Sequence, residues 1–484
     1  MRISSNPRGP QPVPSSFGLR PSALPAMSRT ADILRLLTRY ESHNVTFIEA
    51  DGSWPIVWAR ARGCHVWDAE GRRYLDLTAA FGVAAAGHAN PRVVRAGQRQ
   101  MATLLHAMGD VHPHALKAEL ARELSRITFE RWTRRSPKFE SRNPKSGKVI
   151  FGNSGFEAVE AALKTAMLAT GKPGVIAFEG AYHGLGYGAL NATHRDHFRS
   201  PFRRQLREFA IFAPFPASVP ELPRVEAALR RFLRRGNIGA VLVEPIQARG
   251  GINLPPPEFL PALRRLCDAH GALLILDEIY TGFGRTGRWF ACEHSGVVPD
   301  LICLGKALTG GFPLSACVGR ADLMDAAWPK SNGEAIHTST FLGHPVGCAM
   351  ALAQIAELRR GKLPERSARL GGQLRELLAS VAADVNRRIP SPGKSARTRV
   401  RGYEASARGE GLIAGIEVRH ADGSPATEEV LGVIKTMLRR GFILLPEGEH
   451  ANVISFTPPL TIAERDLRQA VAVLREVLEE LVTA

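Results

Sequence analysis

The stretch from residue 275 to residue 311 constrains the fold and the chemistry of this chain more than any other. A short apolar run, 272–276, ends in two carboxylates, the first of which is Asp277, and a second run, 301–304, is followed by Gly-Lys306. Short runs rich in isoleucine and leucine are typical of strands that are buried on both faces of a parallel sheet. Because ligands of open α/β sheets bind beyond the carboxyl ends of the strands, we expect Asp277 and Lys306 to meet at one sheet edge.

A lysine and a carboxylate at one sheet edge are the pair that pyridoxal 5'-phosphate (PLP) chemistry requires, for a Schiff base and for the pyridinium nitrogen. The acid lies in I-L-D-E-I-Y-T-G-F-G-R-T-G and the lysine in G-K-A-L-T-G-G. From about Gly63 to the C-terminus, the chain resembles the class III (omega-type) PLP-dependent aminotransferases of fold type I. The resemblance implies that Lys306 is the Schiff-base lysine and that Asp277 is the partner of the pyridinium nitrogen.

The same resemblance implies an α/β fold, with a mostly parallel central sheet in a large domain and a smaller α+β domain built from both ends of the chain. We expect residues 86–345 to form the large PLP-binding domain, and residues 31–85 and 346–484 to form the two parts of the small domain. Residues 1–30 are rich in proline, serine and arginine and contain no acid, which predicts a disordered tail. A transit-like segment and a true start at Met27 are the alternatives for this region.

Composition argues against several other classes of protein. The 484 residues are 23% charged and 44% hydrophobic, which is ordinary for a globular enzyme. No apolar stretch reaches the ~18 residues that a membrane span requires. The formal net charge of +17 is dispersed and accompanies no nucleic-acid-binding motif, so we expect a basic solvated surface. The six cysteines contain no C-x-x-C pair, which predicts no metal site and no disulfide framework, and favours free thiols in a reducing, cytoplasmic compartment.

A candidate phosphate site follows the predicted strand 149–152. The sequence there reads N-S-G-F-E and then enters a predicted helix, so backbone N–H groups and the positive helix end can face an anion. The resemblance places the cofactor phosphate on Ser154, Gly155 and Phe156. Phe156 departs from the smaller or hydroxylated residue that the family usually has, which preserves backbone contacts but removes a hydroxyl contact.

Further cofactor contacts are implied by the resemblance alone. Tyr182, in G-A-Y-H-G, is expected to stack on the cofactor ring and to support its role as an electron sink, which places it among the catalytic residues. His183, next to it, is either a cofactor contact or a structural histidine, and Glu244 is expected to be a further cofactor contact. Thr340 is expected to reach the cofactor phosphate of a neighbouring subunit, which implies a homodimer with shared active sites.

The chain departs from the family where the substrate is usually recognised. Many members read E-P-I-Q-G-E-x-G and V-I-R-F-x-P-P-L; that arginine receives the substrate α-carboxylate, and the second glutamate pairs with it and moves it aside for amine-bearing substrates. Here the matching residues are Arg249 and Ser455. We hypothesise that Arg249 supplies the positive charge from the other side; a solvated loop arginine is the alternative. Phe81 is expected to line the substrate pocket or the core, and Tyr280 to approach the cofactor or to pack.

Together these patterns predict an enzyme that moves an amino group from an omega-amino acid or amine, such as 4-aminobutyrate, to a 2-keto acid. An aminomutase, a racemase or a decarboxylase on the same scaffold is the alternative. The segment G-F-G-R-T-G after Asp277 favours an aminotransferase over an aminomutase, whereas Ser455 leaves racemase chemistry open. A non-enzymatic regulator is a second alternative, but the N-terminal region offers no helix-turn-helix. The expected partners are small molecules and a second copy of the chain, with neither nucleic acid nor membrane.

Overall fold

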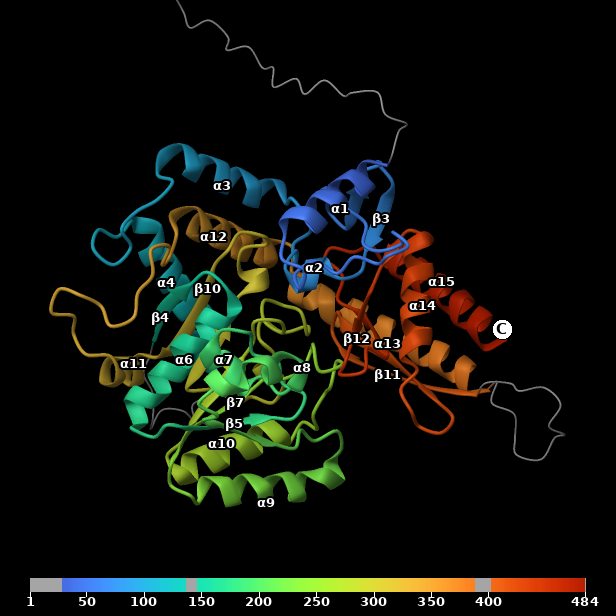
Figure 1. The fold of residues 1–484 in the computed structure, drawn as a ribbon. Helices are drawn as coiled ribbons and strands as arrows, with labels where there is room; N and C mark the ends of the chain where they lie inside the picture. Colours follow the sequence, from blue (N-terminus) through green and yellow to red (C-terminus); the bar gives the residue numbers. More distant parts are fainter. Residues whose placement is uncertain (1–27, 136–145, 388–401, 484) are drawn as a thin grey trace, which may run out of the picture.

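The structure is a computed structural model that describes residues 28–135, 146–387 and 402–483. Helices and strands alternate along most of the chain and build three sheets (Figure 1). The tail predicted at residues 1–30 lies outside the described residues, except for its last three. Within the described part, no helix is long and apolar enough to cross a membrane.

The central sheet has seven strands in the order β4-β10-β9-β8-β7-β5-β6. The five strands from β9 to β6 run parallel to one another, and β10 is antiparallel to both β4 and β9. The fold is therefore α/β with a mostly parallel central sheet, as predicted. The strands are β4 (Gly147–Gly152), β5 (Gly174–Phe178), β6 (Ala210–Ala213), β7 (Ile238–Val243), β8 (Leu273–Asp277), β9 (Leu301–Leu304) and β10 (Ser315–Arg320).

Helices cover both faces of this sheet (Figure 1). Along β7, Ala240 and Leu242 belong to the apolar cluster under α6, whereas Val241 and Val243 belong to the larger cluster on the opposite face. Because both faces are buried, every residue of the strand is apolar or glycine, which explains the continuous apolar runs in the sequence. The covering helices are α6 (Gly155–Thr170) on one face, and α4 (Ala115–Ile127), α9 (Leu222–Leu233), α10 (Phe259–His270) and α12 (Pro345–Arg360) on the other.

Two smaller sheets accompany the central one, and the first joins segments that are far apart in the sequence. In the first, β3 pairs in parallel with β13, where Leu75 lies opposite Phe442, so both ends of the chain meet in one sheet. The division into domains at the predicted boundaries stays a prediction. The first sheet contains β1 (Trp58–Arg62), β2 (His65–Asp68), β3 (Arg73–Asp76) and β13 (Phe442–Ile443), and the second contains β11 (Tyr403–Glu410), β12 (Ile413–His420), β15 (Val453–Phe456) and β14 (Leu445–Glu447).

Helices from the C-terminal part of the chain pack against these sheets. The helix α13 (Leu363–Arg387) packs against β11 and α15 (Glu464–Thr483), and α14 (Thr427–Arg439) packs against α15. The described residues also include α1 (Arg29–Tyr40), α2 (Ala79–Gly82), α3 (Pro91–Thr103), α5 (Phe129–Arg135), α7 (Tyr187–Ala192), α8 (Asp196–Arg199) and α11 (Ala321–Ala327).

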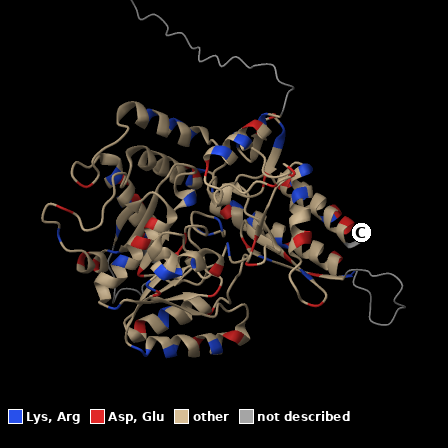
Figure 2. Cartoon of the chain, in the orientation of Figure 1, with Lys and Arg blue, Asp and Glu red and all other residues tan. Residues whose placement is uncertain are grey.

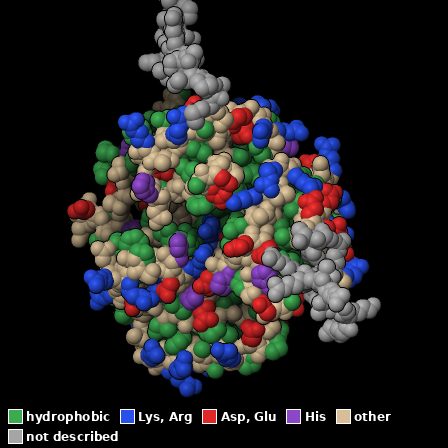
Figure 3. Space-filling view, turned by 45° about the vertical axis from the view of Figure 1, so that its right-hand side comes forward, with side chains coloured by type: hydrophobic (Ala, Val, Ile, Leu, Met, Phe, Trp, Pro, Cys, Tyr) green, Lys and Arg blue, Asp and Glu red, His purple; other side chains and the backbone are tan. Residues whose placement is uncertain are grey.

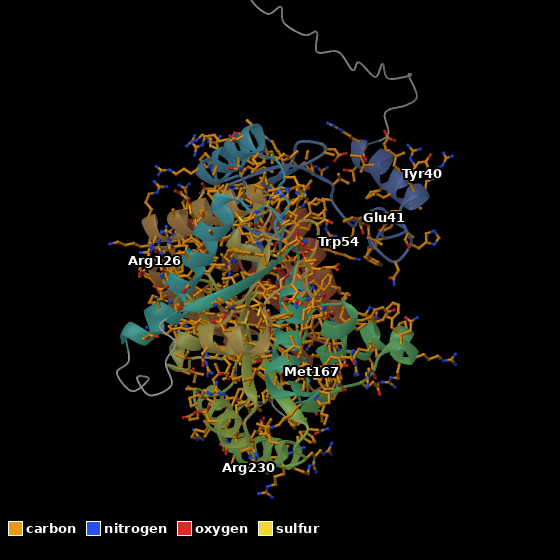
Figure 4. The ribbon with its side chains drawn as sticks, turned by 90° about the vertical axis from the view of Figure 1, so that its left-hand side faces the viewer. Tyr40, Glu41, Trp54, Arg126, Met167 and Arg230 are labelled. Atoms are coloured by element: carbon orange, nitrogen blue, oxygen red, sulfur yellow. The ribbon has the colours of Figure 1, made fainter. Side chains whose placement is uncertain are left out.

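The basic side chains are spread over many elements rather than gathered on one. Lys and Arg, like Asp and Glu, are scattered over the helices and loops of the ribbon (Figure 2). Arg126 on α4 and Arg230 on α9, for example, lie at separate places on the outside of the molecule (Figure 4). All six cysteines are buried free thiols.

The order of the central strands determines where the functional residues meet. Neighbouring strands β8 and β9 are parallel, and Asp277 at the end of β8 lies opposite Cys303, three residues before Lys306. The strand β4 runs in the same direction as β9, because β10 is antiparallel to both. The loops that follow β4, β5, β7, β8 and β9 therefore lie along one sheet edge, as the sequence predicted for Asp277 and Lys306.

Candidate active site

A cavity of about 380 Å³ opens at this edge of the central sheet. The space-filling view shows a hollow in the middle of one face, with basic side chains inside it and histidines near its rim (Figure 3). Five loops from one sheet edge thus converge on a single site. The cavity is lined by Gly155, Phe156, Tyr182, His183, Gly184, Leu185, Glu244, Arg249, Asp277, Ile279, Tyr280 and Lys306.

The Asp277 carboxylate is fixed in place by two contacts. Its Oδ2 lies 2.8 Å from His183 Nδ1, and its Oδ1 accepts a hydrogen bond from the Ile279 backbone N–H at 3.1 Å. Both ionisable side chains are buried, and His183 Nε2 has no hydrogen-bond partner among the described residues. His183 therefore positions Asp277 and leaves a ring nitrogen toward which a ligand or a water molecule can bind.

Lys306 follows Gly305 beyond the end of β9. Its backbone has a φ of 42°, in the left-handed region, where a residue other than glycine costs ~1–3 kcal/mol and is often found at functional sites. The Nζ atom lies 4.6 Å from the centre of the Tyr280 ring. Burial lowers the pKa of the Lys306 amine, while Asp277 and Glu244 oppose this shift. The lowered pKa increases the fraction of neutral amine, which is the nucleophilic and basic form.

The N-terminus of α6 forms another wall of the cavity. Gly155 and Phe156 line it, and the positive end of a 16-residue helix is a suitable place for a phosphate. Close packing requires the glycines here: a Cβ at Gly184, where φ is 111°, would lie 2.4 Å from Phe156 Cβ. Ser154 caps α6 and its backbone N–H donates to Glu157 Oε2 at 2.7 Å.

The loop after β5 is attached to the loop after β7 through Glu244. Its Oε1 accepts a hydrogen bond from the Tyr182 backbone N–H at 2.9 Å, and its Oε2 accepts one from Ala248 at 3.3 Å. Burial raises the pKa of the Glu244 carboxyl to about 7, against the opposing effect of His183. The Tyr182 ring lies 5.6 Å from the Phe198 ring, so packing helps to hold the aromatic face in the cavity wall.

An ion pair that the sequence did not predict lies at the Arg249 end of the cavity. Arg249 Nε is 3.6 Å from Oε2 of Glu447, the last residue of β14, and the Gly448 N–H donates to the Arg249 carbonyl at 3.1 Å. The Arg249 guanidinium carbon lies 5.5 Å from the centre of the Tyr182 ring. The one sequence feature that could have pointed to Glu447 is that it is a single acid in the otherwise apolar segment G-F-I-L-L-P-E-G.

Four predicted site residues do not line the cavity that the described residues form. Ser455 is buried within β15 and donates its Oγ hydrogen bond to the Leu445 carbonyl at 3.1 Å. Phe81 is 47% exposed, Thr340 is exposed, and the Ser154 side chain faces the cap of α6. In this single chain, Ser455 therefore occupies a structural position in the sheet.

Tyr280 combines packing with a place in the cavity wall. Its hydroxyl lies 3.2 Å from Thr457 Oγ1, and burial raises the pKa of this phenol to about 12. Because its hydroxyl already has a partner, Tyr280 presents its ring, rather than a polar atom, to Lys306.

Comparisons with known proteins agree with this geometry. The family model for aminotransferase class-III matches residues 47–478. The chain belongs to the class III aminotransferases. It is 34% identical to the acetylornithine aminotransferase of Methanosarcina acetivorans over 426 residues, which cover 88% of this chain and 92% of that protein. It is 35% identical to the 5-aminovalerate aminotransferase DavT of Pseudomonas aeruginosa, over 88% of this chain and 94% of that protein.

Solved structures place this aminotransferase in the same fold. The ornithine aminotransferase of Toxoplasma gondii is similar with a TM-score of 0.77 and 28% identity, over 95% of this chain and 97% of that one, and was crystallised with partial occupancy of PLP. This aminotransferase is therefore a PLP-dependent transaminase. Its cavity fits the cofactor, because a lysine amine, an anchored carboxylate, an aromatic ring and a helix N-terminus all line one space.

We predict that Asp277→Asn lowers kcat on the order of a hundredfold while leaving the thermal midpoint close to that of the wild type. An asparagine keeps an acceptor for the Ile279 N–H and still reaches His183, so the fold loses little. The negative charge beside the cofactor nitrogen is lost. Steady-state kinetics and thermal denaturation measure the two effects, and full activity in this variant would contradict the role of Asp277.

Glu278→Gln is the matched control for Asp277→Asn, because it replaces the neighbouring carboxylate with an amide. Glu278 accepts hydrogen bonds from Ala291 N–H, Cys292 N–H and the Thr281 hydroxyl at 2.7–2.8 Å. A glutamine amide nitrogen would face one of these donors, at a cost of ~1–3 kcal/mol. This variant should therefore lower the thermal midpoint, and equal losses of stability in both variants would assign Asp277 to structure instead.

Proposed function

We propose that this aminotransferase moves an amino group from an omega-amino acid or amine, such as 4-aminobutyrate, to a 2-keto acid. The observation that carries the proposal is the Arg249 guanidinium, which lines the same cavity as the Lys306 amine and Asp277. A group that binds carboxylates thus stands beside the groups that react with amines. The two relatives are named for acetylornithine and for 5-aminovalerate at nearly equal identity, so they support the reaction class and not one donor.

The residues of the cavity divide the reaction between them. When bound, the cofactor supplies an electron sink for the electron pair of the donor's C–H bond. Lys306 would hold the cofactor through its aldehyde. Once freed, its amine would act as general base, taking a proton from the donor carbon, and then as general acid, returning that proton to the cofactor carbon. Asp277, held by His183, would keep the ring nitrogen protonated, and Tyr182 would confine the ring by stacking.

The first experiment tests the reaction itself. The wild-type protein loaded with PLP should be yellow, and its visible absorbance should bleach when 4-aminobutyrate or another omega-amine is added, with release of a carbonyl compound. A 2-keto acid should then restore the colour. Lys306→Ala should bind no cofactor covalently, so borohydride reduction should label the wild type at Lys306 and leave the variant unlabelled. Bleaching without a released carbonyl would favour a mutase or racemase.

Arg249 is the proposed carboxylate-binding group. Its planar guanidinium offers two parallel N–H donors to a carboxylate, and its side chain is one-third exposed, at the cavity. Ser455 does not compete for this role, because its hydroxyl donates to Leu445. The positive charge at this end of the cavity therefore comes from the loop after β7.

We predict that Arg249→Ala raises the KM for a 2-keto acid tenfold or more, the effect of losing a charged hydrogen bond of ~1.5–3 kcal/mol. Arg230→Ala, an exposed arginine on α9, is the control and should leave the KM unchanged. Initial rates at saturating donor concentration measure the effect. An unchanged KM for pyruvate and for 2-oxoglutarate would remove Arg249 from substrate recognition.

A second copy of the chain is the proposed partner. Large apolar side chains are exposed on two segments, 101–111 and 336–341, the second of which contains Thr340. The two segments touch: the Thr338 hydroxyl donates to Asp110 at 2.7 Å, and the rings of His106 and Phe341 are 5.3 Å apart. A contiguous exposed apolar surface supports a protein interface. Its apolar residues are Met101, Leu104, Leu105, Met108, Val111, Ile336 and Phe341.

We predict that Leu105→Asp changes the solution mass from that of a dimer to that of a monomer. Leu105 is 59% exposed in the single chain, and a charge would be buried without a partner in the dimer. Activity should fall with the mass, because Thr340 then reaches no second active site. Light scattering after gel filtration measures the mass. Val219→Asp, which changes an exposed valine preceding α9, should stay dimeric; a monomeric wild type would reject the shared site.

A further inference from the structure

A second cavity, of about 350 Å³, lies beside α6 and shares no lining residue with the cavity that contains Lys306. It is bounded by α6, by the start of β5 at Gly174 and by Phe209, which precedes β6. Sites for small ligands are concave and usually have volumes of ~300–1,000 Å³. This second cavity, which we call the α6 cavity, is therefore large enough for a small molecule.

One wall of the α6 cavity is apolar. Leu163 on α6, Val175 on β5 and Ala240 on β7 are buried members of the apolar cluster between α6 and the central sheet. Met167, which is labelled in Figure 4, lines the same cavity and is 46% exposed. Because removing apolar surface from water is favourable, this wall favours a ligand that has an apolar part.

The polar side chains of the lining are mainly basic. Lys164, Lys172 and Arg207 line the α6 cavity, and none of them forms an ion pair with an acid among the described residues. The Lys172 ammonium donates to the His270 carbonyl at 3.3 Å, and Lys164 Nζ lies 3.1 Å from His337 Nδ1. These contacts hold the two ammonium groups in place but provide no negative charge.

Among the described residues, Glu160 is the one acid that lines the α6 cavity, and its carboxylate already has partners. Its Oε1 accepts hydrogen bonds from the Gly188 N–H at 2.7 Å and from the Ala189 N–H at 3.0 Å. Both donors belong to the first turn of α7, so Glu160 holds the start of that helix. Three basic side chains beside one acid leave the cavity with an excess of positive charge.

We propose that the α6 cavity is a second ligand site, which binds a monocarboxylate with an apolar chain. The chain would cover Met167 and the apolar wall next to it, and the carboxylate would neutralise the basic side chains, among them Lys172 and Arg207. Hydrogen bonds between a lysine or arginine and a carboxylate are among the strongest in proteins. The inference goes beyond the transfer of amino groups, because none of these residues lines the cavity of Lys306.

The lining favours a ligand with both parts over a ligand with only one. A small inorganic anion would leave the apolar wall at Met167 in contact with water. A neutral apolar molecule would displace water from the basic side chains without supplying a counter-charge, which is unfavourable. A carboxylate at one end of an apolar chain avoids both costs.

The first experiment measures the binding of octanoate to the PLP-loaded wild type by isothermal titration calorimetry. We expect saturable binding that is about tenfold or more tighter than the binding of 1-octanol, which has the same chain without the charge. Acetate, which has the charge without the chain, should show no binding at the same concentrations. The affinity for octanoate should fall as the salt concentration rises, because salt screens the basic side chains.

Met167→Asp tests the location of the site, with Leu168→Asp as its matched control. The two side chains are neighbours on α6 and are 46% and 44% exposed, but Leu168 does not line the cavity. Met167→Asp should weaken the binding of octanoate about tenfold or more, because it removes an apolar contact and repels the carboxylate. Leu168→Asp should leave the affinity close to that of the wild type.

Arg207→Ala tests the charge, with Arg204→Ala as its matched control. Both arginines are exposed, and Arg204 does not line the cavity. Arg207→Ala should weaken the binding of octanoate about threefold, since solvent screens an exposed charge. Arg204→Ala should not change it. Should Met167→Asp not fold, as judged by its thermal midpoint, this pair of variants and the comparison with 1-octanol decide.

Arg249→Ala separates the α6 cavity from the cavity of Lys306, where a carboxylate could also bind. The binding that is weakened in Met167→Asp should persist in Arg249→Ala. Loss of all octanoate binding in Arg249→Ala would overturn the proposal, as would equal effects of Met167→Asp and Leu168→Asp. A wild type that binds no octanoate, or that binds 1-octanol equally well, would also overturn it. None of these results affects the release of a carbonyl compound, which tests the proposed function.

Discussion

The parallel pairing of β8 with β9 is the constraint on which the site depends. It places Asp277 opposite Cys303 and so brings Lys306, three residues later, to the edge where the carboxylate ends its strand. The pairing is stable because both strands are buried on both faces, between α6 and the helices of the opposite layer. A register shift of one residue would turn Asp277 to the other face of the sheet. The apolar packing that specifies the register therefore also specifies the chemistry.

The buried carboxylates near this sheet edge differ in how many hydrogen bonds they accept from surrounding residues. Glu278 accepts three hydrogen bonds from its own surroundings and leaves nothing for a ligand. Asp277 shares its oxygens between His183 and one backbone N–H, and still lines the cavity. Glu447 accepts none from the described residues and has only an ion pair at 3.6 Å. From Glu278 to Asp277 to Glu447, the carboxylate accepts fewer hydrogen bonds from the surrounding residues, and so keeps more acceptor capacity for a bound molecule.

Much of the fold and the reactive centre could be predicted from sequence because the signals are local. The apolar runs before Asp277 and Lys306 predicted β8 and β9, and the glycine-rich segments around them identified the family. Substrate recognition could not be predicted in the same way. The contact of Arg249 with Glu447 joins residues almost two hundred positions apart, through loops whose spacing no periodicity describes. The bond from Ser455 to Leu445 depends likewise on a pairing of β14 with β15.

The electrostatic environment of Lys306 explains why Arg249 occurs together with an acid on β14. Where the resemblance implies a glutamate on the loop after β7 and an arginine on β15, this chain has Arg249 and the neutral Ser455. This chain has an acid, Glu447, on β14, the strand that pairs with β15. Without this acid, the positive charge of Arg249 would lower the pKa of the Lys306 amine further. Glu447 offsets that repulsion, so the reversed pair preserves the electrostatic balance around the Lys306 amine.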